Sequence, residues 1–556
     1  MLPSLLELSL YSCELKHLPS SLTFLNFTSL HVLDLSYNPF NTSIDLSYNP
    51  FNTSIPQWLF NLMSLTNLDL TRTNQRGKML DSFRRFGRLK YFYLGGNHFY
   101  GSILASIGNL SSLKELSLSY NEIDGTILES FGQLSKLVKL YLLENSWKSV
   151  ITEAQLMNLT RPIKALYLRN DLSENLLYGK IPLSISKIKH LIILDLRRNN
   201  LSGELPHQWN ESQKGLHVVD ISYTNICGKI PSSMGFLGNL SILVLSNNNL
   251  SGEIPSSLQN CSIVSMDFGG NHLSGILPSW IDLDIFMLRL QSNLFNLAQN
   301  NLFGGIPDCL NNFTAMVDHK IVRFEHIENY TEKASIMRKG REMEYDGTLP
   351  LVTYIDISGN NLTGGIPFEI TSLIGLDMLN LSMNHLSGNI PNNIGNLSLL
   401  ETLDFSNNKI FGRIPESMSS LTFLVHLNLS FNNLRGRIPS GNQLQTINDA
   451  TMYKGNPLLC GSPLLSKCPG DETSDDPTII GAEDKQNGDD YERIWFYASI
   501  VLGFVVGFWS VCGTILLKKS WRHQYFHFCD DIKDRIASLI ALKVVHLKGK
   551  FGLEKS

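Results

Sequence analysis

Several features that are common in enzymes and small secreted domains are scarce in this chain of 556 residues. It has only eight cysteines, too few for a dense disulfide framework at this length. Its formal net charge is only −4, and no basic stripe indicates nucleic-acid binding. It lacks a glycine-rich phosphate loop, an HRD motif and a DFG motif, so the sequence excludes a protein kinase. Because no nucleophile–base pair, paired carboxylates or metal-ligand cluster emerges, we predict no enzyme, no cofactor and no metal site.

The N-terminus also lacks a secretory signal peptide. Residues 1–5 enter a repeat directly, with no basic segment, apolar segment or cleavage site before it. Nothing precedes Cys13 to cap the first coil, although terminal repeats normally need a polar cap. The sequence is therefore interpreted as missing its natural front end.

What the chain has in abundance is a leucine repeat, best seen in residues 240–258, LSILVLSNNNLSGEIPSSL. This stretch has the form LxxLxLxxNxLxGxIPxx of a leucine-rich repeat. The LxL core predicts a short strand with Leu243 and Leu245 directed inward and Val244 outward. Asn248 stands where the chain turns off the strand, and its amide can bond backbone groups of adjacent turns.

The second half of the unit contains residues suited to a sharp return. Gly252 tolerates a left-handed or crowded backbone, and Pro255 fixes φ for the return segment. One unit cannot bury enough apolar surface alone, so the pattern requires stacking against similar neighbours. Most units are 24 residues apart, and the residues in the asparagine position are Cys13, Asn38, Asn49, Thr73, Asn97, Asn121, Asn145, Asn175, Asn199, Thr224, Asn248, Asn271, Asn293, Asn300, Asn360, Asn384, Asn408 and Asn432.

The GxIP segments, such as Gly388–Pro391 and Gly436–Pro439, resemble the plant-specific extracellular leucine-rich repeat. This resemblance covers nearly all of residues 1–440. It implies an α/β solenoid, a right-handed superhelix with parallel strands on the concave face and 3₁₀ segments on the convex face.

The period of the repeats is irregular at three places. Residues 34–44 and 45–55 are an identical tandem copy, and residues 168–175 and 290–302 join parts of units that should be further apart. One interpretation is an adapted kink in the solenoid. The interpretation we favour is gene-model or splicing damage, because seven or eleven residues cannot complete a coil.

Residues 312–350 interrupt the repeats between the segments 1–311 and 351–440. The insertion is charged and aromatic, so it is either a disordered loop or a small folded island. Tyr330, followed after eight residues by Lys339 and Gly340, resembles the Y-x8-KG signature of island domains in plant leucine-rich-repeat receptor-like proteins. The four repeats after it match the membrane-proximal repeats of that family.

Residues 441–470 resemble the C-terminal cap of the same family, which implies that Cys460 and Cys468 pair. The other cysteines at repeat positions are predicted to be free and to act as small buried apolar residues; these are Cys13, Cys227, Cys261 and Cys309.

The repeats are followed by an acidic spacer, residues 471–493, and then by residues 494–517, which contain no charge. A helix of this length reaches about 36 Å, enough to cross a hydrocarbon core of about 30 Å. Lys518, Lys519 and Arg522 follow it, so the positive-inside rule predicts a single-pass plasma-membrane protein with a cytosolic tail, residues 518–556. That tail is either an amphipathic basic helix or a disordered stub.

N-x-S/T sequons are frequent before the predicted span and absent after it, which agrees with an extracellular N-terminal part. The sequon asparagines are Asn26, Asn41, Asn52, Asn109, Asn158, Asn200, Asn210, Asn239, Asn249, Asn260, Asn312, Asn329, Asn361, Asn380, Asn396 and Asn428.

Two further sets of residues are candidate interaction sites. Gly503 and Gly507 form a GxxxG pair on one face of the predicted span, suited to helix packing in lipid. Outward strand positions carry aromatic and cationic residues, which either suit a ligand face or reflect ordinary surface variation. We expect these to be exposed; they are Tyr91, Tyr93, Tyr141, Tyr167, Arg169, Arg197 and Arg198.

The resemblance implies a cell-surface receptor-like protein without a kinase domain, of the disease-resistance or EIX-receptor type. Its expected partners are an extracellular peptide, protein or glycan ligand, an adaptor receptor kinase at the transmembrane helix, and a shared co-receptor kinase at the repeats after the island. Perception of microbial or elicitor molecules in plant defence is the favoured function. The alternatives are a developmental peptide receptor, a truncated non-signalling decoy and a wall-enzyme inhibitor.

Overall fold

The structure is a computed structural model of the whole chain. It describes residues 4–469 except 14, 16–26, 28, 39–56, 79–80, 104, 127–130, 132, 154–162, 169–176, 283–292, 309–332, 339–340, 347–352 and 448. The chain divides into two units, residues 1–471 and 472–556, and all described residues belong to the first.

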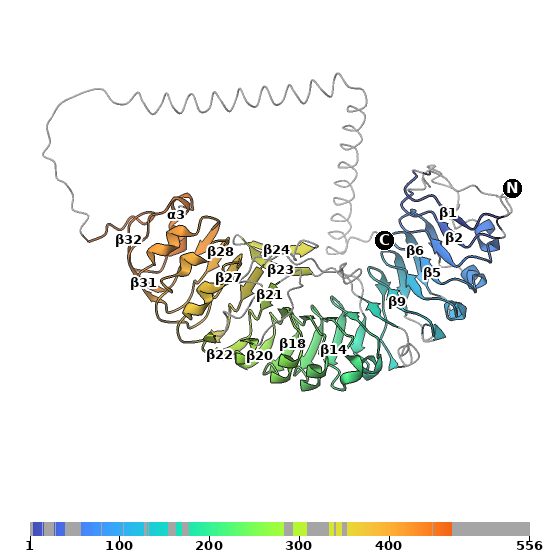
Figure 1. Cartoon of the computed structure of the whole chain (residues 1–556), viewed down its shortest axis with the longest axis horizontal. Coiled ribbons are helices and arrows are strands. Elements are labelled where there is room, and N and C mark those ends of the chain that lie inside the picture. Colours follow the sequence, from blue (N-terminus) through green and yellow to red (C-terminus); the bar gives the residue numbers. More distant parts are fainter. Residues whose placement is uncertain are drawn as a thin grey trace, which may run out of the picture. The chain divides into compact units, whose positions relative to one another are not determined.

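The first unit is built around one long sheet of short parallel strands that follow one another in sequence order (Figure 1). Each strand comes from a successive coil of the chain, as the leucine pattern predicts. The strands are β1 (Glu7–Ser9), β2 (Val32–Asp34), β3 (Asn67–Asp69), β5 (Tyr91–Tyr93), β7 (Glu115–Ser117), β9 (Lys139–Tyr141), β11 (Ala165–Tyr167), β13 (Ile193–Asp195), β15 (Val218–Asp220), β17 (Ile242–Val244), β19 (Ser265–Asp267), β21 (Asn293–Asn296), β25 (Thr353–Asp356), β27 (Met378–Asn380), β28 (Thr402–Asp404) and β30 (His426–Asn428).

Smaller parallel sheets form from the residues that follow the asparagine position in each coil, which the sequence did not predict. The first consists of β4 (Arg76–Lys78), β6 (His98–Ser102), β8 (Glu122–Gly125) and β10 (Ser146–Trp147). The second consists of β12 (Tyr178–Lys180), β14 (Asn200–Glu204), β16 (Asn225–Gly228), β18 (Asn249–Gly252), β20 (His272–Ile276), β22 (Asn301–Gly304) and β26 (Asn361–Leu362). The third consists of β29 (Phe411–Gly412), β31 (Asn433–Arg437) and β32 (Leu458–Cys460).

The return segments are 3₁₀ helices, in agreement with the prediction. They are η1 (Gln57–Asn61), η2 (Asp81–Arg85), η3 (Ala105–Asn109), η5 (Leu183–Lys187), η6 (Glu211–Gln213), η7 (Ser232–Phe236), η8 (Ser256–Asn260), η9 (Ser279–Asp282), η12 (Phe368–Ser372), η13 (Ile394–Asn396) and η14 (Glu416–Ser420). A further 3₁₀ helix, η15 (Ala450–Tyr453), belongs to the C-terminal cap. Pro255 precedes η8 with φ −68°, and Gly252 has φ +78°, as the residue types at these positions require.

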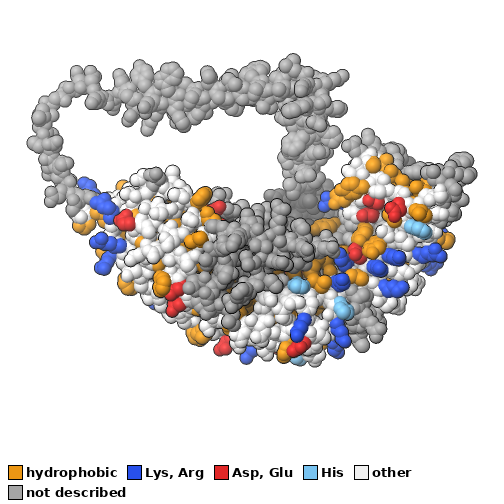
Figure 2. All heavy atoms as spheres, in the orientation of Figure 1, with side chains coloured by type: hydrophobic (Ala, Val, Ile, Leu, Met, Phe, Trp, Pro, Cys, Tyr) orange, Lys and Arg blue, Asp and Glu red, His pale blue; other side chains and the backbone are white. Residues whose placement is uncertain are grey.

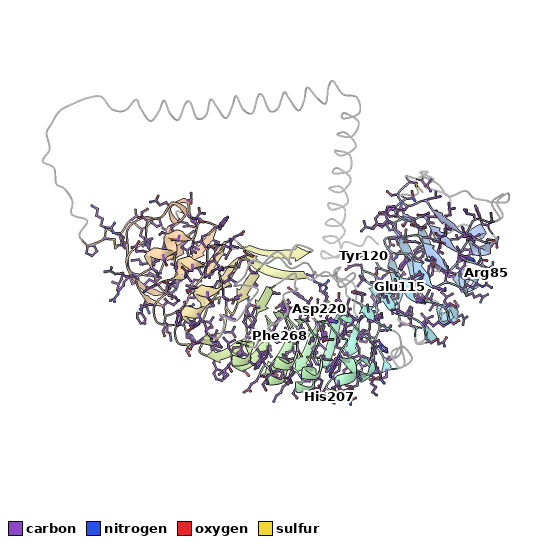
Figure 3. All side chains as sticks on the ribbon, in the orientation of Figure 1. Arg85, Glu115, Tyr120, His207, Asp220 and Phe268 are labelled. Carbon is purple, nitrogen blue, oxygen red and sulfur yellow. A yellow bond between two sulfur atoms is a disulfide. The ribbon has the colours of Figure 1, made fainter. Side chains whose placement is uncertain are left out.

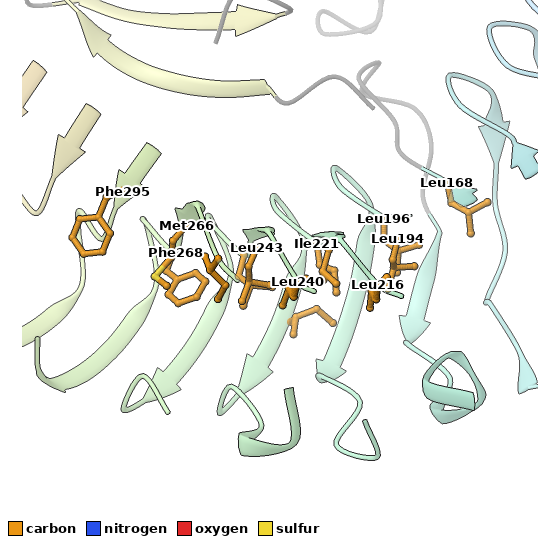
Figure 4. Close-up of a cluster of buried hydrophobic side chains, with 14 of the residues drawn as sticks. Leu168, Leu194, Leu196, Leu216, Ile221, Leu240, Leu243, Met266, Phe268 and Phe295 are labelled. Carbon is orange, nitrogen blue, oxygen red and sulfur yellow. The ribbon is translucent and has the colours of Figure 1, made fainter. Parts of the chain in front are cut away.

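The core is a continuous column of leucine, isoleucine and phenylalanine side chains that lies inside the coils. Leu243 and Leu245 are fully buried in it, and Figure 4 shows Leu240 and Leu243 between Ile221 and Met266 of the neighbouring coils. Strand β17 pairs with β15 and β19 in a register that places Leu243 beside Met266. Each coil therefore buries its apolar side chains against the next coil.

The asparagine at the turn joins neighbouring coils by hydrogen bonds. The Asn248 Nδ2 atom donates to the carbonyls of Ile221, Leu245 and Ser246 at 2.8–3.2 Å. Its Oδ1 atom accepts a hydrogen bond from the backbone N–H of Ile226 at 3.0 Å. The amide thus satisfies buried backbone groups of its own coil and of the preceding one.

The three irregular places do not interrupt the long sheet. Strand β2 pairs directly with β3, β11 pairs with both β9 and β13, and β21 pairs with both β19 and β25. The assignment of Asn293 to an asparagine position is wrong, because Asn293 begins strand β21 and pairs with Thr353. Asn300 occupies the asparagine position of that coil, and its Nδ2 donates to Phe268 and Leu297 carbonyls.

Two elements depart from the repeat. Within the insertion, β23 (Lys333–Arg338) and β24 (Arg341–Asp346) form an antiparallel hairpin. After the last repeat, the short helix α3 (Asn442–Thr446), η15 and β32 close the end of the solenoid, and a disulfide bond joins Cys460 to Cys468. Strand β32 pairs with β31, so this cap continues the last small sheet.

No helix among the described residues is long and apolar enough to cross a membrane. The predicted span at residues 494–517, with Gly503 and Gly507, lies outside that part of the chain.

Candidate functional site

The outward side chains of the long sheet form a continuous surface, which we call the strand face. Because side chains alternate along a strand, each three-residue strand contributes its first and third residues to this face. The candidate ligand residues belong to it or follow it directly. Arg169 lies outside the described residues, as do Tyr330, Lys339 and Gly340 of the island motif.

On β5, β7 and β9 the strand face is half-exposed and combines aromatic with charged side chains. Tyr91, Tyr93 and Tyr141 are half-buried here, and the Tyr93 hydroxyl donates to Glu115 Oε2 at 2.6 Å. Lys139 Nζ lies 3.9 Å from Glu115 Oε1. Figure 2 shows acidic and hydrophobic side chains close together over the N-terminal coils, and Figure 3 labels Glu115. This surface can offer both flat apolar contact and hydrogen bonds to a ligand.

The Tyr93 hydroxyl stays protonated at physiological pH. Partial burial raises the pKa of Tyr93, and the hydrogen bond to Glu115 raises it further. The hydroxyl therefore acts as a fixed donor to Glu115, which orients both side chains.

Tyr141 and Tyr167 form a stacked pair on the neighbouring strands β9 and β11. Their ring centroids are 4.7 Å apart and their planes differ by 9°. Tyr141 is half-buried, but only 2% of Tyr167 is exposed, so the prediction that Tyr167 is exposed is wrong. Tyr167 belongs to an apolar cluster on the strand face, and such a bulky ring is stabilised by burial there.

That cluster is a feature that sequence reasoning missed. It comprises Leu143, Ala165, Tyr167, Ile193, Val218, Ile242 and Val244. Most of these residues are first or third residues of β11, β13, β15 and β17, positions that are expected to face away from the core. The third residue of the neighbouring strands is usually aspartate. Its replacement by Val244 in the sequence LVLS is the signal that could have revealed this cluster.

Arg197 is buried rather than exposed, which also corrects the prediction. Only 2% of its surface is exposed, and it lies between two carboxylates. Its Nε lies 3.6 Å from Asp195 Oδ1, and its Nη1 lies 3.2 Å from Asp220 Oδ2. Figure 3 labels Asp220 on β15. A buried guanidinium needs such partners, because an unpaired charge is costly to desolvate.

Arg198 is half-buried and lies in the turn after the strand. Its guanidinium carbon is 5.1 Å from the ring centroid of Tyr223 in the next coil. A cation held over an aromatic ring is stabilised by that ring's quadrupole. Arg198 is therefore fixed in place at the edge of the strand face.

In the last coils, the final residue of the strand alternates between aspartate and asparagine from β25 to β30. Asn380 Nδ2 donates to Asp356 Oδ2 at 3.0 Å, and Asn428 Nδ2 donates to Asp404 Oδ2 at 3.2 Å. Burial raises the pKa of Asp356, and hydrogen bonds from Ser358, Tyr354 and Asn380 oppose this effect. The alternation avoids the contact of like charges on adjacent strands.

The remaining sequence predictions concern cysteines and metal binding. Cys13 and Cys227 are free but exposed, so the expected burial is wrong for them, whereas Cys261 is half-buried. Burial raises the pKa of Cys261 to about 11, which disfavours its reactive thiolate. Cys309 is outside the described residues, and within these residues no group of three acidic, histidine or cysteine side chains could hold a metal ion.

Comparison with known families agrees with this geometry. The leucine-rich-repeat family model matches residues 42–62, 112–134, 190–211, 239–261, 351–373, 375–397, 399–421 and 423–444. The stacked coils, the asparagine turns and these matches show that the chain contains leucine-rich repeats.

Among proteins with such repeats, the sequence is similar to plant receptor-like proteins. It is 46% identical over 443 residues to receptor-like protein EIX2 of Solanum lycopersicum, an alignment that covers 69% of this chain and 43% of that protein. It is 41% identical over 322 residues to receptor-like protein EIX1 of the same plant, covering 51% of this chain and 31% of that protein. The chain thus spans less than half the length of these two relatives.

A solved structure shares the fold at lower identity. The Arabidopsis receptor kinase HAESA, in complex with the peptide hormone IDA and the co-receptor SERK1, is 28% identical, with a TM-score of 0.59. The match covers 80% of this chain and 68% of that one. The expected parallel strands and 3₁₀ segments of a plant leucine-rich-repeat solenoid are confirmed.

Proposed function

We propose that this protein is a cell-surface receptor without a kinase of its own, and that its strand face binds an extracellular ligand. The observation that carries this proposal is the half-exposed surface of Tyr91, Tyr93, Glu115 and Tyr141, on a solenoid similar in sequence to the EIX receptor-like proteins. Aromatic side chains next to charged partners are typical of binding hot spots.

The ligand proposed is a microbial or elicitor molecule perceived in plant defence. The similarity to EIX2 and EIX1 supports this class over others. A developmental peptide is the second candidate, because the related HAESA solenoid was solved with a peptide hormone. Both ligands would be recognised outside the cell.

The proposed location is the plasma membrane, with the solenoid outside and the tail in the cytosol. The uncharged residues 494–517 and the cations Lys518, Lys519 and Arg522 support this topology. Residues 518–556 contain no kinase motif, which supports a role for partner kinases in passing on the signal.

We propose two contacts with such kinases. An adaptor kinase would pack against Gly503 and Gly507, which allow close approach of a second helix in lipid. A co-receptor would bind the repeats formed by β25, β27, β28 and β30. The related HAESA solenoid was solved with a co-receptor, which supports the second contact.

The island motif is proposed to take part in the response. Tyr330 would anchor the island, and Lys339 with Gly340 would form a turn; these two residues are the ones between strands β23 and β24. Tyr330→Ala and Gly340→Ala should abolish ligand or co-receptor response while cell-surface amount is unchanged. Normal responses of both variants would show that the island is a spacer.

The receptor proposal is tested by expressing the full chain, with an added signal sequence, in leaf cells. The cells are treated with protein and peptide fractions of a fungal culture filtrate, and the oxidative burst is measured. We expect the Tyr93→Ala/Tyr141→Ala variant to lose the response at unchanged surface amount.

The matched control is Tyr100→Ala, which removes a half-buried tyrosine of β6 in a small sheet. Its response should equal that of the unaltered chain. A normal response of the double variant would contradict binding at the strand face, and an unaltered chain that ignores every fraction would contradict the defence role.

A further inference from the structure

Nine of the ten sequons among the described residues occupy three positions on the coil, and the tenth, at Asn210, caps the N-terminal end of η6. In the first, the asparagine lies at or just after the end of a 3₁₀ helix. Asn109, Asn260 and Asn396 are the last residues of η3, η8 and η13, and Asn239 lies in the turn before β17. All four side chains are exposed.

In the second position, the asparagine begins a strand of the second small sheet. Asn200, Asn249 and Asn361 are the first residues of β14, β18 and β26, and all three are exposed. At both of these positions a glycan can extend into solvent without displacing a neighbouring coil.

The third position is on the strand face and differs in burial and in bonding. Asn380 and Asn428 are the third residues of β27 and β30, and both are half-buried. Each Nδ2 donates to the aspartate of the preceding coil, at 3.0 Å and 3.2 Å. Each Oδ1 accepts from the backbone N–H and hydroxyl of the serine two residues later, at 2.8–3.2 Å.

An N-linked glycan at this third position would conflict with the folded coil. The sugar is attached to Nδ2, the atom that bonds the neighbouring aspartate. Asn380 pairs with Asp356 on one side and Asp404 on the other, and adjacent strands are only about 4.8 Å apart. Glycans are added before a coil folds. A chain modified at Asn380 must therefore fold with a sugar packed between the neighbouring residues Asp356 and Asp404.

We propose that the folded protein carries N-glycans at the helix-end and small-sheet positions and none at Asn380 and Asn428. The strand face of the last coils is thereby kept free of sugar and open to a protein partner. This inference rests on the proposed function in one respect, the passage of the chain through the secretory pathway.

The test is a site-by-site measurement of glycan occupancy on the full chain, purified from the surface of leaf cells after expression with an added signal sequence. Glycopeptides are released by protease, deglycosylated in ¹⁸O water and analysed by mass spectrometry. We expect high occupancy at Asn109, Asn239 and Asn396, and at least ten-fold lower occupancy at Asn380 and Asn428.

Two matched variants each create a new sequon in the last coils, and the glycan occupancy of each new sequon is measured in the same way. Asp404→Asn is nearly isosteric and creates an Asn-Phe-Ser sequon on the strand face. Ser420→Asn creates an Asn-Leu-Thr sequon at the exposed last residue of η14. The new site of Ser420→Asn should be occupied, and that of Asp404→Asn should not.

The outcomes separate this inference from the receptor proposal. Occupancy at Asn380 or at the Asp404→Asn site equal to that at Asn396 would overturn the proposed absence of glycans from the strand face. It would not affect the receptor proposal. A complete absence of glycans from every sequon would also overturn this inference, whereas a chain that never reaches the cell surface would contradict the receptor proposal.

Discussion

At the scale of single residues, the asparagine found in most turns joins neighbouring coils by hydrogen bonds. Asn248 is nearly fully buried, and its amide bonds carbonyls of two coils as well as the backbone N–H of Ile226. Because the site is buried, water cannot replace the amide. Loss of the amide would therefore leave several backbone groups without a hydrogen-bond partner.

We therefore expect Asn248→Ala to lower the free energy of unfolding by about 2–4 kcal/mol. Asn248→Thr should lose less, because Thr224 and Thr73 occupy the same position and donate a hydroxyl hydrogen bond to the carbonyl three residues earlier. Gln259→Ala, at an exposed position, serves as the control in chemical denaturation. Equal stability of Asn248→Ala and Gln259→Ala would contradict the role assigned to this amide.

A second residue-scale prediction concerns Asp356 and pH. Burial raises the pKa of Asp356 above its ordinary value of 3.8, so the folded state holds this proton more tightly than the unfolded state does. Its contribution to stability is therefore present below the unfolded pKa and is lost as the pH rises through the folded pKa.

Asp356→Asn should remove that contribution, so its thermal midpoint should fall less than that of the unaltered chain as the pH rises from about 4 to 7. Gln259→Ala, at an exposed position and without a titratable group, is the control and should keep the unaltered pH dependence. Asp356→Asn creates an Asn-Ile-Ser sequon, so the proteins are made in a host without N-glycosylation. Identical pH profiles for Asp356→Asn and the unaltered chain would contradict the direction of the shift.

At the scale of elements, the cap illustrates how the end of a solenoid is closed. Strand β32 pairs with β31, and the disulfide bond between Cys460 and Cys468 closes a short loop beside it. The side chains of Leu459 and Cys460 are buried against the last coil. The cap therefore covers apolar surface that the next repeat would otherwise cover.

Replacing both cysteines, in Cys460→Ser/Cys468→Ser, should lower stability by about 2–3 kcal/mol, the effect of opening a loop of this length. Amide hydrogen exchange should accelerate first in β31 and β32. Cys227→Ser, at a free and exposed cysteine, should change neither quantity. Uniform acceleration along all coils, or none, would show that the cap does not act locally.

Much of this element structure was predictable from sequence, and the failures have physical causes. The strands, turns and 3₁₀ returns follow from leucine spacing, asparagine and the glycine–proline pair, because these residues are needed in every coil. The small sheets were missed because their sequences, such as Asn249–Gly252, are short and polar and do not show strand alternation. Asn293 was misassigned because asparagine type alone does not distinguish a turn from the start of a strand.

The candidate site was less predictable than the fold. Position in the repeat correctly placed Tyr91, Tyr93 and Tyr141 on the strand face. It could not reveal the burial of Tyr167 and Arg197, because that depends on neighbours contributed by other coils and by tertiary packing. Pairings between coils, such as Asn380 with Asp356, likewise become visible only when the register is known.

At the scale of the whole molecule, the described coils stack on one long sheet, although the coils differ in length. The coil from Asn271 to Asn300 and the duplicated segment before β3 both leave the strand order intact. Each coil must meet its neighbours only at the strand, the turn and the core, so coils of different length can share one sheet.

The central proposal is that the solenoid lies outside the cell and that the C-terminus lies in the cytosol. The most direct test is the accessibility of the two parts in intact leaf protoplasts that express the full chain with an added signal sequence and a C-terminal epitope. A membrane-impermeant amine reagent should label solenoid lysines such as Lys180 and Lys409, while an antibody should reach the epitope only after permeabilisation. Protection of the solenoid lysines in intact cells, or exposure of the epitope, would contradict the account.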